Sequence, residues 1–143
     1  MDSKNVVELI KEYASNVRTT DERSLFVTVD LKNFEKMLQK LKEAGVTHIS
    51  TITGVDTGDF VEVIYHFDCR PAMLSLKIFL PRDDPKIQTI SGIFPGAVLY
   101  ERDLMEMLGV RVEGHPDPRR LFLPDDWPEG EYPLRKGWRE KKR

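Results

Sequence analysis

The spacing of hydrophobic residues predicts two amphipathic helices in the first third of the chain. Apolar side chains recur at helical spacing through residues 3–17, and again from Leu31 to Gly45, with Asp30 placed as the cap of this second helix. The apolar positions are Val6, Ile10, Tyr13 and Val17 in the first helix, and Leu31, Phe34, Leu38 and Leu41 in the second. Each helix therefore has one face to bury.

Four runs with β-type patterns are predicted strands: residues 25–29, 46–53, 61–67 and 74–80. The second run is rich in Val, Ile and Thr. In the last two runs every second residue is apolar and is expected to point inward, and the residues between them are expected to point to the other face of the sheet. The turn GVDTGD and the Arg70-Pro71 step separate the last three runs. These three strands are expected to form an antiparallel meander with one buried face.

The pattern changes after PRDDPK. Residues 86–91 are expected to form at least one helical turn, and residues 97–108 a stronger helix that ends at Gly109. From Gly114 onward prolines punctuate the chain, at Pro116, Pro118, Pro124, Pro128 and Pro133. Proline removes backbone donors and favours extended geometry. The sequence thus predicts an α+β domain at residues 1–109, with two helices, a mostly antiparallel sheet and a third helix, followed by an extended arm at 110–143.

Composition narrows the class of function. The 143 residues carry a net charge of −2, which argues against a nucleic-acid binder. Asn and Gln are few beside a 32% share of charged residues, a pattern typical of thermophile proteins. Cys69 is the only cysteine, which excludes an internal disulfide and a four-cysteine iron–sulfur or zinc site, so no cofactor is expected in this chain. Without a secretory signal or a run of about 18 apolar residues, membrane contact is expected only through a partner.

Motifs for catalysis are missing from the sequence. It contains no GxGxxG, GxxxxGK[ST], GxSxG or HExxH pattern. His48 and His66 fall on predicted strands and are interpreted as structural histidines. Cys69 stands beside Arg70, which could lower the pKa of the thiol, but no second cysteine or strong base signal accompanies it. A catalytic thiol is therefore not expected.

Charged residues gather on the last helix and the arm. On the helix, the ordinary interpretation is a solvated face in which Arg102 and Glu106 pair. The arm adds arginines, which pair with carboxylates in forked geometry, and aromatic residues, and both types are enriched at interfaces. A stiff arm also loses little entropy on docking. The residues predicted to contact a partner are Glu101, Arg102, Glu106, His115, Asp117, Arg119, Arg120, Phe122, Trp127 and Arg135.

Two alternatives to docking remain open. A free-standing enzyme could use His115 and Asp117, although the arm supplies neither a nucleophile nor a metal site to accompany them. A small anion-binding module could use the basic residues 135–143, for which the commoner interpretation is a solvated, frayed terminus.

The stretch ERDLMEMLGVRVEGHPDPRRLFLPDDWPEGEYPLRK resembles the signature region of the 30 kDa subunit family of respiratory complex I, the NADH-quinone oxidoreductase. Relatives occur in membrane-bound energy-converting hydrogenases. The chain departs from the family pattern at Asp103, Met105, Pro118 and Gly137, where Glu, an aromatic residue, Leu and an acidic residue are usual.

The resemblance implies a non-catalytic, cofactor-free subunit of the peripheral arm, on the cytoplasmic side of the membrane. It implies that the subunit packs against the large subunit related to nickel–iron hydrogenases and near the small iron–sulfur subunit, with its tail along these partners. Iron–sulfur clusters are then expected in the partner subunits. We further expect residues 110–143 to be mobile in the isolated chain until a partner orders them.

Overall fold

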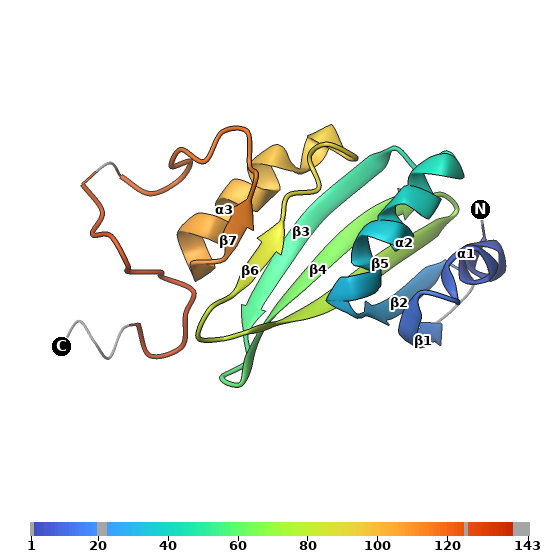
Figure 1. Cartoon of the computed structure of the whole chain (residues 1–143), viewed down its shortest axis with the longest axis horizontal. Helices are drawn as coiled ribbons and strands as arrows, with labels where there is room; N and C mark the ends of the chain where they lie inside the picture. The colour runs from blue at the N-terminus through green and yellow to red at the C-terminus, as the bar shows by residue number, and fades with distance from the viewer. Residues whose placement is uncertain (1, 20–22, 125, 139–143) are drawn as a thin grey trace. The chain divides into compact units, whose positions relative to one another are not determined.

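A computed structural model describes residues 2–19, 23–124 and 126–138 (Figure 1). In chain order the elements are α1 (Ser3–Ile10), β1 (Ala14–Thr19), β2 (Ser24–Val29), α2 (Leu31–Glu43), β3 (His48–Asp56), β4 (Phe60–Cys69), β5 (Ala72–Pro81), β6 (Lys86–Gln88), the 3-10 helix η1 (Pro95–Ala97), α3 (Val98–Leu108) and β7 (Arg111–Glu113). The predicted α+β class is confirmed. No helix in the described part of the chain is long and apolar enough to cross a membrane.

The main sheet is mixed and mostly antiparallel, with the strand order β1-β2-β5-β4-β3. β1 pairs antiparallel with β2, β2 pairs parallel with β5, and β3, β4 and β5 are neighbours in chain order, as expected of a meander. The burial of β4 alternates along its length, so one set of its side chains faces the core. A second, two-stranded parallel sheet joins β6 to β7, with Ile87 opposite Val112.

The chain divides into two compact units. The first comprises Met1–Thr51 with Ile64–Ile78, and the second Ile52–Val63 with Phe79–Arg143. In the first unit α1 and α2 pack side by side (Figure 1), and the ring of Phe34 on α2 lies 4.9 Å from that of Tyr65 on β4. α3 and the arm that follows it belong to the second unit. The predicted division into residues 1–109 and 110–143 stays a prediction.

Two glycines of the second unit allow close packing around α3. At Gly54 on β3, a Cβ atom would lie 2.3 Å from the side chain of Leu108 and 2.7 Å from that of Leu104, so only glycine lets the helix approach this closely. Gly109 ends α3 in the left-handed region, at φ 71°. A Cβ atom at Gly109 would also lie 2.4 Å from the ring of Tyr132 in the arm. The glycine thus ends the helix and makes room for the arm.

The first helix is shorter than the hydrophobic spacing predicts. α1 ends at Ile10, and residues 14–19 form β1 instead of continuing the helix to residue 17. Val17 faces Val27 across the antiparallel pair. Pairing with β2 outweighs a weak helical pattern that passes through Ser15 and Asn16, both poor helix formers.

The prediction of a helical turn at residues 86–91 is also wrong. Residues 86–88 form β6, whose partner β7 lies more than twenty residues later in the chain. A three-residue strand carries almost no periodic signal, so only its partner identifies it. Asp30 does occupy the N-cap position of α2, but its side chain makes no capping hydrogen bond.

Candidate functional site

Arg102 and Glu106, one turn apart on α3, hold the backbone of the arm. Arg102 donates from Nε to the carbonyl oxygen of Arg119 (2.7 Å) and from Nη2 to that of Arg120 (2.6 Å). The two oxygens of the Glu106 carboxylate accept hydrogen bonds from the N–H groups of Leu121 and Phe122. Both α3 residues are buried. The ordinary interpretation of a solvated face is therefore wrong for this pair, because backbone groups of the arm replace water around their charges, whereas their contact with a partner stays a prediction.

Asp117 connects the arm's own arginine to the same cluster. Arg119 forms a forked pair with it, at 2.6 Å from Nε and 2.8 Å from Nη2, while Arg102 Nη1 lies 3.6 Å away. The hydrogen bonds from Arg119, assisted by the charges of Arg119 and Arg102, lower the pKa of Asp117 to about 2. The side chain of Arg119 remains 80% exposed, and Arg120 donates to the carbonyl oxygen of Pro124.

Glu101 and His115 form a buried pair at the start of α3. The Glu101 carboxylate accepts from Thr89 Oγ1 (2.6 Å) and from the N–H of Ile90 (3.0 Å), and its Oε1 lies 3.9 Å from His115 Nε2. Burial raises the pKa of Glu101 against the opposing effect of these hydrogen bonds.

The hydrogen bonds of His115 assign its tautomer. Nδ1 accepts from the N–H of Asp117 (3.0 Å), so the neutral ring carries its proton on Nε2, which lies 2.9 Å from the carbonyl oxygen of Val98. The His115 side chain is 1% exposed. Both ring nitrogens are thus engaged within the chain, and neither faces solvent.

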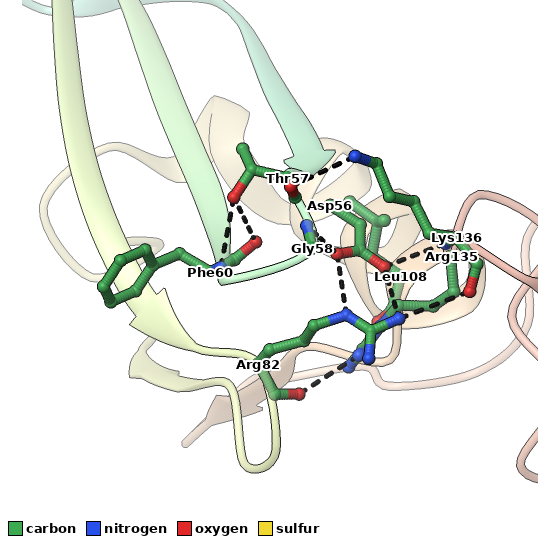
Figure 2. A network of polar contacts seen from close by, with 8 residues as sticks. All are labelled: Asp56, Thr57, Gly58, Phe60, Arg82, Leu108, Arg135 and Lys136. Carbon is green, nitrogen blue, oxygen red and sulfur yellow. Dashed lines mark hydrogen bonds and ion pairs between the residues drawn. The ribbon is translucent and has the colours of Figure 1, made fainter.

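A second cluster, which we call the latch, consists of Asp56, Arg82, Arg135 and Lys136 (Figure 2). The Asp56 carboxylate, at the end of β3, is completely buried and accepts from Arg82 Nε (2.9 Å) and Nη2 (3.0 Å). It also accepts from the N–H groups of Gly58 (2.9 Å) and Lys136 (2.8 Å). Burial alone would raise the pKa of Asp56, but these hydrogen bonds outweigh it and hold the pKa well below its ordinary value.

The arm supplies the other half of the latch. Arg135 donates to the carbonyl oxygens of Leu108, in the last turn of α3, and of Arg82 (3.1 Å). Lys136 donates from Nζ to the carbonyl oxygen of Thr57 (3.1 Å), as Figure 2 shows. Hydrogen bonds from the PLRK sequence therefore hold the arm against the end of α3 and the β3–β4 turn.

Sequence reasoning named Arg135 as a partner contact, which stays a prediction, and it did not name Asp56, Arg82 or Lys136. Asp56 belongs to GVDTGD, which predicts only a turn, and that turn is confirmed between β3 and β4. Arg82 lies 26 residues later in the chain. A carboxylate inside a turn is a weak signal for a site, and nothing in the sequence pairs it with a particular arginine.

Aromatic residues complete the arm. The indoles of Trp127 and Trp138 stack with their centroids 5.6 Å apart, and Trp127 Nε1 donates to the carbonyl oxygen of Glu131. Trp127 and Tyr132, with Arg102 and Glu106, line a cavity of about 350 Å³ between the arm and α3. Phe122 behaves differently, because it is 65% exposed.

The two strand histidines and Cys69, which the sequence analysis interpreted as structural or non-catalytic, lie in the first unit. His48 is exposed, and His66 lies 3.0 Å from Ser75 Oγ, with its pKa lowered by burial. The expectation that Arg70 lowers the pKa of Cys69 is wrong: burial raises it to about 11, and Arg70 pairs with Asp68. Across residues 2–19, 23–124 and 126–138, no group of three or more His, Cys, Asp or Glu could hold a metal ion.

The sequence matches the family model described as "Respiratory-chain NADH dehydrogenase, 30 Kd subunit" over residues 27–143. It is 37% identical over 117 residues to the membrane-bound hydrogenase subunit beta of Pyrococcus furiosus, covering 78% of this chain and 68% of that protein. It is 39% identical over 95 residues to a subunit of the F(420)H(2) dehydrogenase of Methanosarcina mazei, covering 64% of this chain and 60% of the relative.

The similarity extends to relatives of greater length and to solved structures. Over 96 residues the chain is 40% identical to a subunit of the NADH-quinone oxidoreductase of Chloroherpeton thalassium, but it spans only 39% of that protein. A chain of the membrane-bound sulfane sulfur reductase, an archaeal respiratory membrane complex, superposes with a TM-score of 0.82 at 27% identity, covering 97% of this chain and 89% of that one. A trypsin-resistant fragment of Nqo5 shares the fold, with a TM-score of 0.68 at 20% identity, covering 80% and 96% of the two chains.

Proposed function

This chain belongs to the family of the 30 kDa subunit of respiratory-chain NADH dehydrogenase, and we propose that it is a non-catalytic peripheral-arm subunit of a membrane-bound, complex I-like oxidoreductase. The relatives that support the proposal are named as subunits of a quinone oxidoreductase, an F(420)H(2) dehydrogenase and a membrane-bound hydrogenase. Its partners would be the large hydrogenase-like subunit and the small iron–sulfur subunit, and it would reach the cytoplasmic side of the membrane through them.

The observation that carries the proposal is that polar side chains of α3 and the arm bind the backbone of this chain itself. Arg102, Glu106 and Arg135 all bond to backbone groups of their own chain. These three side chains shape a surface and are not themselves free to act on a substrate. A binding subunit needs such a shaped surface, whereas an enzyme needs an accessible acid, base or nucleophile.

The alternative of a free-standing enzyme is disfavoured by the same geometry. His115 is almost fully buried and both of its nitrogens have partners, while Asp117 is held ionised by arginine. The anion-binding alternative cannot use Arg135 as a ligand, because its guanidinium already donates to two carbonyl oxygens. Residues 139–143, on which that alternative also depends, lie outside the described residues.

The test is capture of the tagged chain from its own cells in mild detergent, with iron and nickel measured in the eluate. We expect co-elution with membrane proteins and stoichiometric iron, because the clusters of such a complex lie on its other subunits. Nickel beside the iron would indicate a hydrogenase. A lone, metal-free monomer, recovered under conditions that keep membrane complexes whole, would contradict the proposal. The same purification from cells without the tag measures nonspecific capture.

A further inference from the structure

Arg102 and Glu106 differ from an ordinary ion pair because their side chains bind backbone groups of consecutive residues in the arm. Arg102 takes the carbonyl oxygens of residues 119 and 120, and Glu106 takes the N–H groups of residues 121 and 122. Four consecutive residues of the arm are thus each held by one backbone group. We call Arg102 and Glu106, with the backbone they bind, the backbone clamp.

The clamp is well placed to be strong. The Arg102 side chain is 10% exposed, and Glu106 is buried. Charge-assisted hydrogen bonds gain strength where water is excluded, and a guanidinium fork and a carboxylate fix direction as well as distance. Proline at position 118 restricts the backbone just before the clamped residues. The arm therefore loses little further freedom when it is held in this geometry.

The clamp leaves side chains free because it binds only the backbone. Phe122 donates its N–H to Glu106 while the residue as a whole is 65% exposed, the largest exposed fraction among the large hydrophobic residues of the described chain. An exposed aromatic ring on a fixed backbone suits an interface, because it buries a large area at a small entropic cost. Rings of this kind are anchors that fill an apolar pocket on a protein partner.

We propose that Arg102 and Glu106 are positioning residues that fix residues 119–122 in the isolated chain, and so present Phe122 as a preformed anchor for an apolar pocket on a partner subunit. The anchoring role rests on the proposed function, whereas the clamp itself does not. The proposal replaces the expectation, based on sequence alone, that the arm is mobile until a partner orders it.

The first test is amide hydrogen exchange, followed residue by residue by NMR on the purified chain. We expect the N–H groups of Leu121 and Phe122 to exchange at least about a hundredfold more slowly than in an unstructured peptide, because both are bonded to a buried carboxylate. Glu106→Gln keeps the shape but turns an NH2 group toward one of these amides, so exchange there should speed up at least about tenfold. Glu113→Gln, on the exposed part of β7, is the matched control and should change neither rate. Unprotected amides in the unaltered chain would overturn the clamp.

The second test compares capture of membrane partners by the unaltered chain, Phe122→Ala, Glu106→Gln and the double variant. We expect each single change to lower capture at least about tenfold. The double variant should lose little more than Phe122→Ala alone, because Glu106 is proposed to affect capture only by positioning Phe122. Full capture by Phe122→Ala would overturn the anchor. If the unaltered chain captures no partner while its amides are protected, the proposed function fails and the clamp stands.

Discussion

At the scale of single residues, Asp56 shows how this fold keeps a buried carboxylate ionised. Its side chain is removed from solvent, yet it receives two N–H groups of Arg82 and two backbone N–H groups. A carboxylate with four donors is stabilised in its charged form by more than burial costs. The residue thereby joins the β3–β4 turn, the end of β5 and the arm within one unit.

Replacing Asp56 with Asn should lower the free energy of unfolding by about 1–3 kcal/mol, because an amide loses the charge and turns an NH2 group toward donors. Solvent around the partly exposed Arg82 keeps the loss in this modest range. Urea unfolding measures the change. Asp59→Asn, an exposed position in the same turn, is the control and should have almost no effect. Equal losses in the two variants would rule out a specific role for the latch.

The same carboxylate predicts how stability depends on pH. The folded-state pKa of Asp56 lies below its ordinary value of 3.8, so its contribution is fully present above about pH 5 and is lost as pH falls through the folded-state pKa. The difference in unfolding free energy between the unaltered chain and Asp56→Asn should therefore shrink from about pH 5 to about pH 2. A difference that stays constant over this interval would contradict the assignment. Asp117 and Glu101 titrate in both proteins and cancel.

At the scale of secondary structure, α3 organises the second unit. One side of the helix packs on β3 at Gly54, and its polar residues hold the β6–β7 region and the arm. Its last turn receives Arg135 at the carbonyl oxygen of Leu108 and the N–H of Leu134 at that of Met107. The arm thus satisfies carbonyl groups that a helix end leaves without partners inside the helix.

Gly109→Ala should destabilise the protein more than a comparable change elsewhere. Gly45→Ala is the matched control, because Gly45 also has a positive φ (97°) but has no heavy atom within 4 Å of the added Cβ. We expect the control to cost about 1 kcal/mol, and Gly109→Ala to cost about 1–3 kcal/mol beyond it because the new methyl group meets the ring of Tyr132. Urea unfolding gives the energies, and faster exchange of the Leu134 amide would locate the disturbance. Equal losses of unfolding free energy in the two variants would show that the Tyr132 ring moves aside at no energetic cost.

At the scale of the whole molecule, α3 and the arm present two groups of side chains. Arg102, Glu106 and Arg135 are turned inward and determine the path of the backbone. Arg119, which is 80% exposed, and Phe122 are turned outward and are available to another subunit. Substitutions in the outward group should therefore lower assembly with little effect on folding, whereas substitutions in the inward group should disturb the path of the backbone and, through it, assembly as well.

The double variant Arg119→Ala, Arg120→Ala should separate the two properties. Capture of partner subunits is expected to fall at least about tenfold, because arginines at an interface contribute strongly to binding. The free energy of unfolding should change little, since the Arg119–Asp117 pair is exposed and surface pairs contribute little. Lys11→Ala, which breaks the exposed pair with Glu8, is the control for loss of a surface charge. Unchanged yield of the complex in the double variant would argue against docking through this part of the arm.

The sequence by itself determined the features that depend on local pattern. Apolar spacing identified α2, α3 and the strands β2 to β5, since each is long enough to show its period. The run from ERDLMEMLG to PLRK determined the family, because motifs are read directly from the order of residues. The extended arm followed from its prolines, which lack the backbone N–H that a helix interior or a central strand requires.

Only the tertiary structure decided what the charges do. Glu101, Arg102 and Glu106 have the spacing of an exposed helix face, and they are buried because the arm and the segment at Thr89–Ile90 bring backbone and side-chain partners to them. β1, β6 and β7 are strands because of partners elsewhere in the chain. Asp56 and Arg82 meet across 26 residues. Such contacts join residues that are far apart in the sequence, so the local order of residues does not show which residues will pair.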